Sequence, residues 1–383
     1  MDESDRYRGL ILHTLQIVFV FGPNIEYIQD AYFHASIYII KGLLLNNNNF
    51  DGVRIGLALI VVFAHIQALT KLPELHFLHY FFDSDFAVKG FFAISGYLVT
   101  QSYLSSRHLS EYAEKRIRRI YPAYLGAILF GLLIAVFVSQ LNWLDFLKAT
   151  QTIQYFLSNL LFLNFIQPSL PGVFLDNPVH QINGALWTIK VEVMLYCCVP
   201  FIVFFFRKFG ASLTTSVIYI LSIVWVYYFS LKFSGEMGKE LARQFPGQLS
   251  YFVAGAFLSM NEKVRTKTLS LFVLSCLLLI ACKHPVMRIL LQPVAYSCLV
   301  IYLAIVAGKG LNFGRYGDIS FGIYLYHFPM IQLLIHLGLF QYNCWLGVAL
   351  SILFTILVAF VSWHLVEKKV LKRNSHYIVA AQQ

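Results

Sequence analysis

The chain is organised around apolar segments that are long enough to cross a lipid bilayer. A spanning helix needs about 20 mostly apolar residues. Ten segments fit this description, and the sixth is the shortest of them: 53–70, 84–103, 120–140, 187–206, 212–231, 247–261, 267–283, 289–308, 319–338 and 344–366. The apolar stretch 153–166 is shorter still, and we expect it to re-enter the membrane or to lie at its surface. The sequence therefore predicts an all-α integral membrane protein with about ten transmembrane helices in a single bundle.

The amino-acid composition indicates an outer surface that faces lipid. Of the 383 residues, 58% are hydrophobic and 13% are charged, whereas a soluble domain has roughly 45–50% apolar and about 25% charged residues. This excess of apolar residues is too large for one buried core. The net charge of +10 comes from basic residues in short loops, where they set membrane orientation. We therefore predict membrane lipids as partners and no nucleic acid.

Two shorter apolar stretches, 9–22 and 31–46, precede the ten segments. Polar residues interrupt both stretches, and a run of asparagines follows them. We interpret residues 1–50 as an N-terminal hydrophobic extension made of interfacial helices or of a tilted hairpin. The predicted membrane domain covers residues 51–372, and residues 373–383 form a cytoplasmic tail.

The distribution of Lys and Arg predicts the orientation of the ten segments. If the first segment starts in the cytoplasm, the loops on the cytoplasmic side hold 16 Lys and Arg residues and the opposite loops hold 7. Cytoplasmic loops carry the excess of basic residues, so both ends of the membrane domain are predicted to be cytoplasmic. The long loop 141–186 then lies on the other side.

The six cysteines all lie in apolar stretches and show no C-x-x-C or Cys/His spacing typical of a metal site. They are interpreted as small buried hydrophobic residues, and no metal is predicted: Cys197, Cys198, Cys276, Cys282, Cys298 and Cys344.

Polar residues inside membrane spans are energetically expensive and mark functional sites. Asp51 and Arg54 stand at the start of the first segment, and His65 follows 11 residues after Arg54. At 1.5 Å per residue, His65 lies roughly 16 Å deeper in the membrane. Asp51 either stabilises the start of the helix or takes part in function. His65 is either a structural residue or a general base, because its ordinary pKa is near neutral.

Two further spans carry polar residues in their interior. Ser95, followed by Gly96, either allows a neighbouring helix to approach closely or supplies a nucleophile. Glu192 lies six residues into its span and needs a partner, for which Arg54, His65 and Lys190 are the candidates.

A basic stretch precedes the third segment. Arg116 and Arg119 are three residues apart and share one helix face, shortly before Pro122 and Tyr124. The pair either anchors the helix at the cytoplasmic surface or binds phosphate groups, for which the planar guanidinium is suited. Pro122 is expected to kink or restart the helix.

The late spans add another imidazole and a carboxylate. Tyr324 and His327 lie inside the ninth segment, and Glu367 follows the tenth. Glu367 is interpreted as a residue of the membrane interface.

These polar motifs, in this order, resemble the family-three membrane acyltransferases over residues 50–370. Ile55 and Lys89 depart from the family pattern, which has Gly after the arginine and an acidic or polar residue before Phe-Phe. The matching motifs are Phe50 to Gly56 followed by His65, Phe91 to Tyr97, Arg116 with Arg119 before Ile120-Tyr121-Pro122, Leu186 to Tyr196, Ser320 to His327, and Glu367-Lys368.

The resemblance implies an enzyme of the bacterial inner membrane that moves an acyl group, most often acetyl, from acyl-CoA to a hydroxyl of a cell-surface or lipid-linked saccharide, such as a lipopolysaccharide O-antigen. It implies acetyl-CoA as the acyl donor. The roles implied for the residues are catalysis by His65, Arg54, Asp51 and Glu192, donor binding by Arg116, Arg119, Ser95 and Tyr124, and acceptor binding by Trp187, Tyr324 and His327.

Two other classes of protein are weighed against this interpretation. A non-enzymatic flippase or exporter of lipid-linked sugars would also need spans with buried charges, but not the family's order of Arg, His and Glu motifs. An enzyme that transfers a phosphoryl-linked group from a polyprenyl donor would carry acidic metal-binding clusters such as D-x-x-D in its loops, and the sequence contains none.

Overall fold

The computed structural model describes residues 48–233, 235–281, 284–307 and 317–371. The chain divides into two compact units, residues 1–48 and 49–383, and the described residues belong almost entirely to the second. The predicted interfacial helices of the extension and the tail at 373–383 lie outside the described residues.

The second unit is built from helices. No strand occurs in its described part, where Ser169 and Gln181 form an isolated bridge, so the predicted all-α class is confirmed. The long helices are α3 (Phe50–Thr70), α5 (Ser84–Leu104), α6 (Leu109–Val138), α9 (Trp187–Phe209), α10 (Ala211–Tyr227), α12 (Phe245–Met260), α14 (Thr268–Ala281), α15 (Pro285–Tyr302), α16 (Ser320–His336) and α18 (Cys344–Ser362).

Shorter elements connect or extend these helices. Short α-helices are α4 (Leu78–Phe81), α7 (Trp143–Lys148), α8 (Thr150–Leu160), α11 (Glu236–Ala242), α13 (Glu262–Arg265), α17 (Leu339–Tyr342) and α19 (Lys368–Val370). Two 3₁₀ turns are η1 (Pro73–Leu75) and η2 (Gly184–Leu186), and three π-helical turns are η3 (Tyr228–Lys232), η4 (Leu303–Ala307) and η6 (Trp363–Glu367).

The predicted number of ten transmembrane helices is too high. Each of the ten apolar segments coincides with a helix, but within the described ranges six helices are both long and apolar enough to cross a membrane: Phe50–Thr70, Leu109–Val138, Gly184–Phe209, Ala211–Lys232, Pro285–Ala307 and Cys344–Val370. Helices α12, α14 and α16 have only 16, 14 and 17 residues. Helix α5 has 21 residues but carries polar ones, among them Lys89, Ser95 and Gln101.

Helix α16 shows why an apolar segment need not face lipid. Fifteen of its residues are buried, because α3, α6 and α18 pack around it. Its apolar side chains therefore serve an internal core, and its sequence pattern resembles that of a lipid-facing span.

The packing of α5 on α12 depends on two glycines. A Cβ atom on Gly96 would lie 1.9 Å from the carbonyl oxygen of Phe252, and one on Gly255 would lie 1.9 Å from that of Ala93. The two backbones approach so closely that no larger residue fits. Gly96 therefore has the packing role that was one of the two interpretations of Ser95-Gly96.

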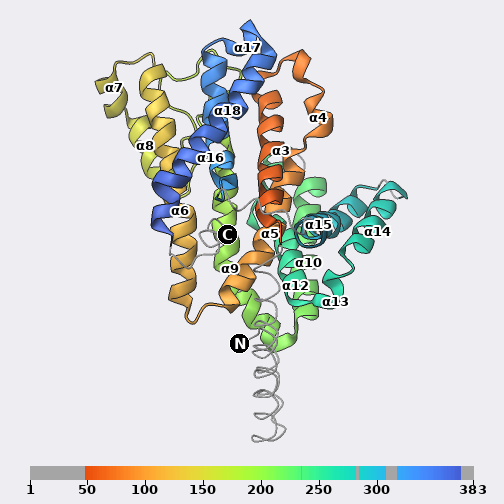
Figure 1. Cartoon of the computed structure of the whole chain (residues 1–383). Helices are drawn as coiled ribbons and strands as arrows, with labels where there is room; N and C mark the ends of the chain where they lie inside the picture. The colour runs from red at the N-terminus through yellow and green to blue at the C-terminus, as the bar shows by residue number, and fades with distance from the viewer. Residues whose placement is uncertain (1–47, 234, 282–283, 308–316, 372–383) are drawn as a thin grey trace, which may run out of the picture. The chain divides into compact units, whose positions relative to one another are not determined.

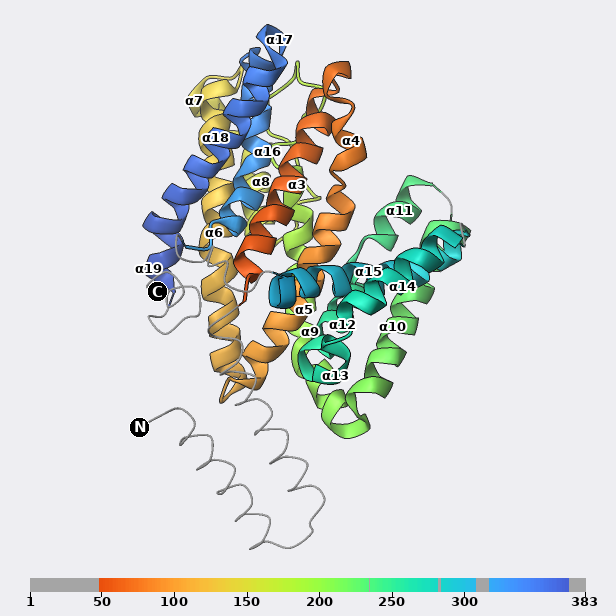
Figure 2. The same ribbon diagram turned by 45° about the vertical axis from the view of Figure 1, so that its right-hand side comes forward.

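The long helices form two groups that share α5. Helices α3, α16 and α18 run alongside one another, while α10, α12, α14 and α15 pack together beside them (Figures 1 and 2). Helix α15 is viewed nearly along its axis in Figure 1, so it crosses the direction of α3. Helix α5 packs against α3, α9, α12 and α15. Helices α3, α5, α9 and α16 together supply the polar residues described next.

Candidate active site

Two imidazole rings face each other between α3 and α16. Nδ1 of His65 lies 2.7 Å from Nε2 of His327, and the rings are nearly parallel, with centroids 4.9 Å apart and an interplanar angle of 7°. His327 is fully buried. We call His65 and His327 the imidazole pair.

The partners of the imidazole pair define its protonation. Nδ1 of His327 lies 3.2 Å from the carbonyl oxygen of Ile323, which can only accept a hydrogen bond. A neutral imidazole has one donor and one acceptor nitrogen, so Nε2 of His327 accepts and Nδ1 of His65 donates. When His65 is neutral, its Nε2 is then the unprotonated nitrogen, which is the form that a general base requires.

A partly open cavity lies one side chain away from the pair, because Tyr324 lines the cavity and packs against His327. Its polar wall combines residues from four helices, and aromatic and aliphatic side chains complete it. The lining residues are Arg54, Val88, Phe91, Phe92, Ser95, Thr188, Ile189, Glu192, Phe321 and Tyr324. The structure therefore brings together four of the predicted site residues, namely Arg54, Ser95, Glu192 and Tyr324.

Tyr324 connects the cavity to the imidazole pair. Its hydroxyl lies 2.7 Å from Oγ1 of Thr188. Its ring packs edge-on against Phe91, with centroids 5.7 Å apart, and against His327 at 5.8 Å. A ligand in the cavity thus lies one side chain away from the imidazole pair.

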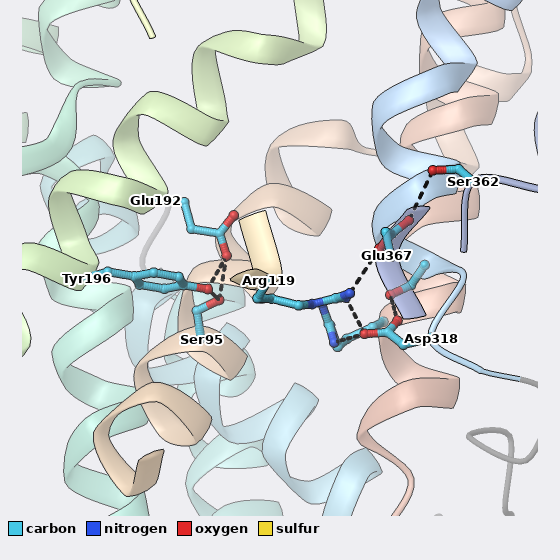
Figure 3. Close-up of polar contacts among 9 residues, drawn as sticks. Ser95, Arg119, Glu192, Tyr196, Asp318, Ser362 and Glu367 are labelled. Carbon is cyan, nitrogen blue, oxygen red and sulfur yellow. Dashed lines mark hydrogen bonds and ion pairs between the residues drawn. The ribbon is translucent and has the colours of Figure 1, made fainter. Parts of the chain in front are cut away.

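Glu192 is hydrogen bonded inside the cavity wall. The hydroxyl of Tyr196 donates to Oε1 of Glu192, and Oγ of Ser95 lies 3.2 Å from the same oxygen (Figure 3). Neither residue had been predicted as a partner of Glu192. The carboxylate and the two hydroxyls form a set of donors and acceptors suited to a hydroxyl or amide group of a ligand.

A second polar group adjoins the cavity through Arg54. Oδ2 of Asp318 accepts hydrogen bonds from Nη1 of Arg54, at 2.5 Å, and from Nη2 of Arg119. Nη1 of Arg119 also donates to Oε2 of Glu367 at 3.1 Å (Figure 3). We call these four residues, Arg54, Arg119, Asp318 and Glu367, the ionic cluster. Its two guanidiniums face two buried carboxyl groups, which compensate for the removal of the arginines from water.

The two arginines of the basic stretch differ in their surroundings. Helix α6 continues through Pro122 without restarting, and both arginines lie in its first half. Arg119 is 4% exposed and bound to carboxylates. Arg116 is half-buried, donates to Oγ of Ser102 at 3.1 Å and lies 5.8 Å from the centre of the Tyr196 ring. Within the described part of the chain, its buried Nε has no hydrogen-bond partner.

The comparison with protein families decides between the classes of protein considered so far. The family model described as the acyltransferase domain matches residues 47–364. The chain belongs to acyltransferase family 3. It is therefore an acyltransferase, and with its six apolar helices it is a multi-pass membrane protein. Nothing in the comparisons supports the flippase or exporter alternative.

Two relatives match most of the acyltransferase. The chain is 27% identical to the O-acetyl transferase of Shigella phage Sf6 in an alignment of 349 positions that covers 86% of this chain and 97% of the relative. It is 26% identical to Nodulation protein 10 of Rhizobium leguminosarum bv. viciae in an alignment of 381 positions that covers 87% of this chain and 95% of the relative. No solved structure matches the chain.

Seven predicted site residues of the acyltransferase do not line the cavity: the imidazole pair, the two arginines of the basic stretch, and Asp51, Tyr124 and Trp187. Asp51 occupies the first turn of α3. Tyr124 is buried, donates to the carbonyl oxygen of Asn159 at 2.9 Å and stacks on Phe162. The ring of Trp187 lies 4.6 Å from the guanidinium of Arg243. Their predicted roles in catalysis, donor binding and acceptor binding therefore stay predictions.

Asp318, Tyr196 and Thr188 are polar residues of the site to which the sequence assigned no role. The interpretation of Glu367 as a residue of the membrane interface is wrong, because Glu367 is 2% exposed and binds Arg119. Tyr196 closed the motif Leu186 to Tyr196, and its four-residue spacing from Glu192 places both on one helix face. Asp318 precedes Ser320 outside any apolar segment, where an acidic residue is common and does not indicate a function. Among the described residues, no group of three or more His, Cys, Asp or Glu side chains has the arrangement of a metal site.

Proposed function

We propose that the protein is an O-acetyltransferase that moves an acetyl group from acetyl-CoA to a hydroxyl of a cell-surface or lipid-linked saccharide. Membership of the acyltransferase family and the likeness to the phage O-acetyl transferase support this proposal. The single observation that carries the mechanism is the imidazole pair beside a cavity with a guanidinium and a carboxylate in its wall.

His65 is the proposed general base. Its Nε2 removes the proton of the saccharide hydroxyl while the oxygen attacks the thioester carbonyl of the donor. The tetrahedral intermediate then collapses, the C–S bond breaks, and the CoA thiolate leaves and takes up a proton. His327 keeps Nδ1 of His65 protonated and so directs Nε2 toward the acceptor.

Arg54 is the proposed stabiliser of the oxyanion. Its guanidinium lines the cavity. A cation that is already fixed beside the developing negative charge lowers the activation barrier of acyl transfer, because the cation does not have to move during the reaction. Glu192 and Ser95 bind polar groups of the two substrates in the same cavity. Asp318 binds Arg54 in the structure.

Arg116 is the proposed binder of the donor phosphates. Arg119 already faces two carboxylates, whereas Arg116 has spare donor capacity beside Ser102 and Tyr196. Four of the five residues 115–119 are Lys or Arg, and such a basic stretch favours the cytoplasmic side of a membrane, so we propose a cytoplasmic position for this arginine at the bacterial inner membrane, with both ends of the domain on the same side. Acetyl-CoA would then enter from the cytoplasm.

A strain without the gene tests the proposed reaction. Mass spectrometry of its surface glycans should show the loss of acetyl groups, and the wild-type gene should restore them. The variant His65→Ala should fail to restore them, whereas His79→Ala, which removes an exposed histidine of α4, should succeed. Unchanged glycans in the strain without the gene would refute the acceptor class, and full acetylation by His65→Ala would remove His65 from the mechanism.

A further inference from the structure

Arg54 belongs both to the cavity wall and to the ionic cluster. Its guanidinium lines the cavity while Nη1 binds Asp318. A free arginine side chain has about 2 kcal/mol of rotamer entropy, so an unheld guanidinium would sample many positions. The residue that fixes it therefore matters for any reaction in the cavity.

Asp318 is held from several directions. Its Oδ2 accepts from Arg54 and Arg119, and its Oδ1 accepts from Oγ of Ser320 at 2.5 Å. Arg119 is bound in turn by Glu367, and Oγ of Ser362 lies 3.3 Å from Oε1 of Glu367 (Figure 3). The carboxylate of Asp318 thus cannot turn to follow a movement of Arg54.

The backbone places Asp318 at this point through a glycine. Gly317 has a φ of +91°, and a Cβ atom there would lie 2.1 Å from Nε1 of Trp363. Only glycine combines this conformation with this close approach. The chain then enters α16 directly, so the position of Asp318 is set by the helix that also carries Tyr324 and His327.

We infer that Asp318 is a positioning residue, which fixes the guanidinium of Arg54 at the cavity wall for acyl transfer. This inference rests on the proposed function. A carboxylate that is itself held by a second arginine gives the cation one orientation before the substrate arrives, and catalytic groups need this preorganisation.

The charge state of Asp318 agrees with this role. Asp318 lies before α16, outside the helices that are long and apolar enough to span the membrane. Burial alone would raise its pKa, but the positive charges of Arg119 and Arg54 hold the pKa at about 2. The residue is therefore ionised at neutral pH and binds Arg54 as a carboxylate.

A purely structural role is the alternative, and Glu367 offers the matched control. Both carboxylates are about 2% exposed, and both bind Arg119. Asp318→Asn weakens the contact that holds Arg54, whereas Glu367→Gln changes a carboxylate that binds Arg119 by its other nitrogen. Both substitutions keep the size of the side chain and remove one buried negative charge.

The experiment compares the two purified variants with the wild type, using radiolabelled acetyl-CoA and glycans extracted from a strain without the gene. Asp318→Asn should lower kcat by about tenfold to hundredfold, since a misplacement of about 1 Å has effects of this size. KM for acetyl-CoA should change less than about threefold, and Glu367→Gln, which leaves the contact of Asp318 with Arg54 in place, should lower kcat clearly less than Asp318→Asn does. A wild-type kcat for Asp318→Asn, or equal losses of kcat and thermal stability in both variants, would overturn the inference.

Two additions keep the test decisive. If Asp318→Asn does not fold, Asp318→Glu retains the charge but shifts the carboxylate, and it should still lower kcat; a wild-type kcat would overturn the inference.

If the wild type transfers no acetyl group, the proposed function fails by itself. The role of Asp318 is then tested by the rate at which phenylglyoxal modifies Arg54, followed by peptide mass spectrometry. This rate should rise in Asp318→Asn but not in Glu367→Gln. Equal rates in the wild type and in Asp318→Asn would refute the contact between Asp318 and Arg54.

Discussion

The ionic cluster and the imidazole pair both join α3 to the region of α16, but they do so with opposite chemistry. The ionic cluster places two arginines against two carboxylates, whereas the imidazole pair is a hydrogen bond between two rings that function in their neutral form. Removing one member of a buried ion pair leaves an uncompensated charge. Removing one ring of the pair leaves no charge. Substitutions in the first region should therefore lower stability, and at Asp318 also kcat, whereas substitutions in the second region should lower the rate of proton transfer alone.

Breaking the ionic cluster at Arg119 should have the largest effect. Arg119→Met leaves Asp318 and Glu367 buried without this guanidinium, and the loss of one partner of a buried ion pair costs about 3–5 kcal/mol. We expect a large decrease in folded protein and in thermal stability, measured by size-exclusion chromatography and thermal unfolding in detergent.

Arg118→Met is the matched control on the same helix. Arg118 is paired with Glu114, both side chains are about 40% exposed, and Nη1 of Arg118 also donates to the carbonyl oxygen of Val370 at 2.8 Å. Its loss should therefore cost no more than about 2 kcal/mol. Equal unfolding temperatures for the two variants would show that the ionic cluster does not stabilise the fold.

Breaking the imidazole pair should affect the rate and leave stability almost unchanged. His327→Gln removes the ring that orients His65, and we expect kcat to fall by about a hundredfold, as for other misplaced catalytic groups. His336→Gln, at the exposed end of the same helix, should leave kcat unchanged. The comparison fails if His327→Gln unfolds at a much lower temperature while the remaining folded protein keeps its kcat.

The contrast between the two regions also explains what the sequence could predict. The apolar segments predicted the position of every long helix described above, because a helix in lipid and a helix in a protein core both consist of such segments. It overcounted the spans, because the composition of α16 does not reveal that α3, α6 and α18 surround it. Length alone cannot separate a helix buried in protein from one that faces lipid.

The same limit applies to the site. Polar residues inside apolar segments were visible, so Arg54, Ser95, Glu192 and Tyr324 were all named before the cavity was known. The contacts between site residues could not be predicted. His65 and His327, for example, are 262 residues apart in the sequence, and only the packing of α3 on α16 brings them together. Asp318 had no such signal, since an acidic residue between apolar segments is ordinary.

Arg116 extends the comparison, because it is an arginine on the same helix as Arg119 but does not belong to the ionic cluster. Arg116→Met should raise KM for acetyl-CoA by about tenfold, in line with the loss of a hydrogen bond from a charged group, worth about 1.5–3 kcal/mol. Thermal stability should change little, because no carboxylate is left unpaired. An unchanged KM would indicate that Arg116 only anchors α6 at the membrane surface.

Tyr324 lies between the cavity and the imidazole pair, and its hydroxyl should make the smallest contribution. Tyr324→Phe keeps the ring against Phe91 and His327 and removes the hydrogen bond to Thr188 and the longer one, at 3.4 Å, to the carbonyl oxygen of Ala185. The Thr188 hydroxyl still has the carbonyl oxygen of Ala185 at 3.0 Å as a partner, so no buried donor is left unsatisfied. The net loss should be about 1 kcal/mol, or roughly a fivefold decrease in kcat/KM measured with labelled acetyl-CoA. A loss as large as that of His327→Gln would instead place the Tyr324 hydroxyl among the groups that contact the substrate, and would make the ring and its hydroxyl part of the proton-transfer region.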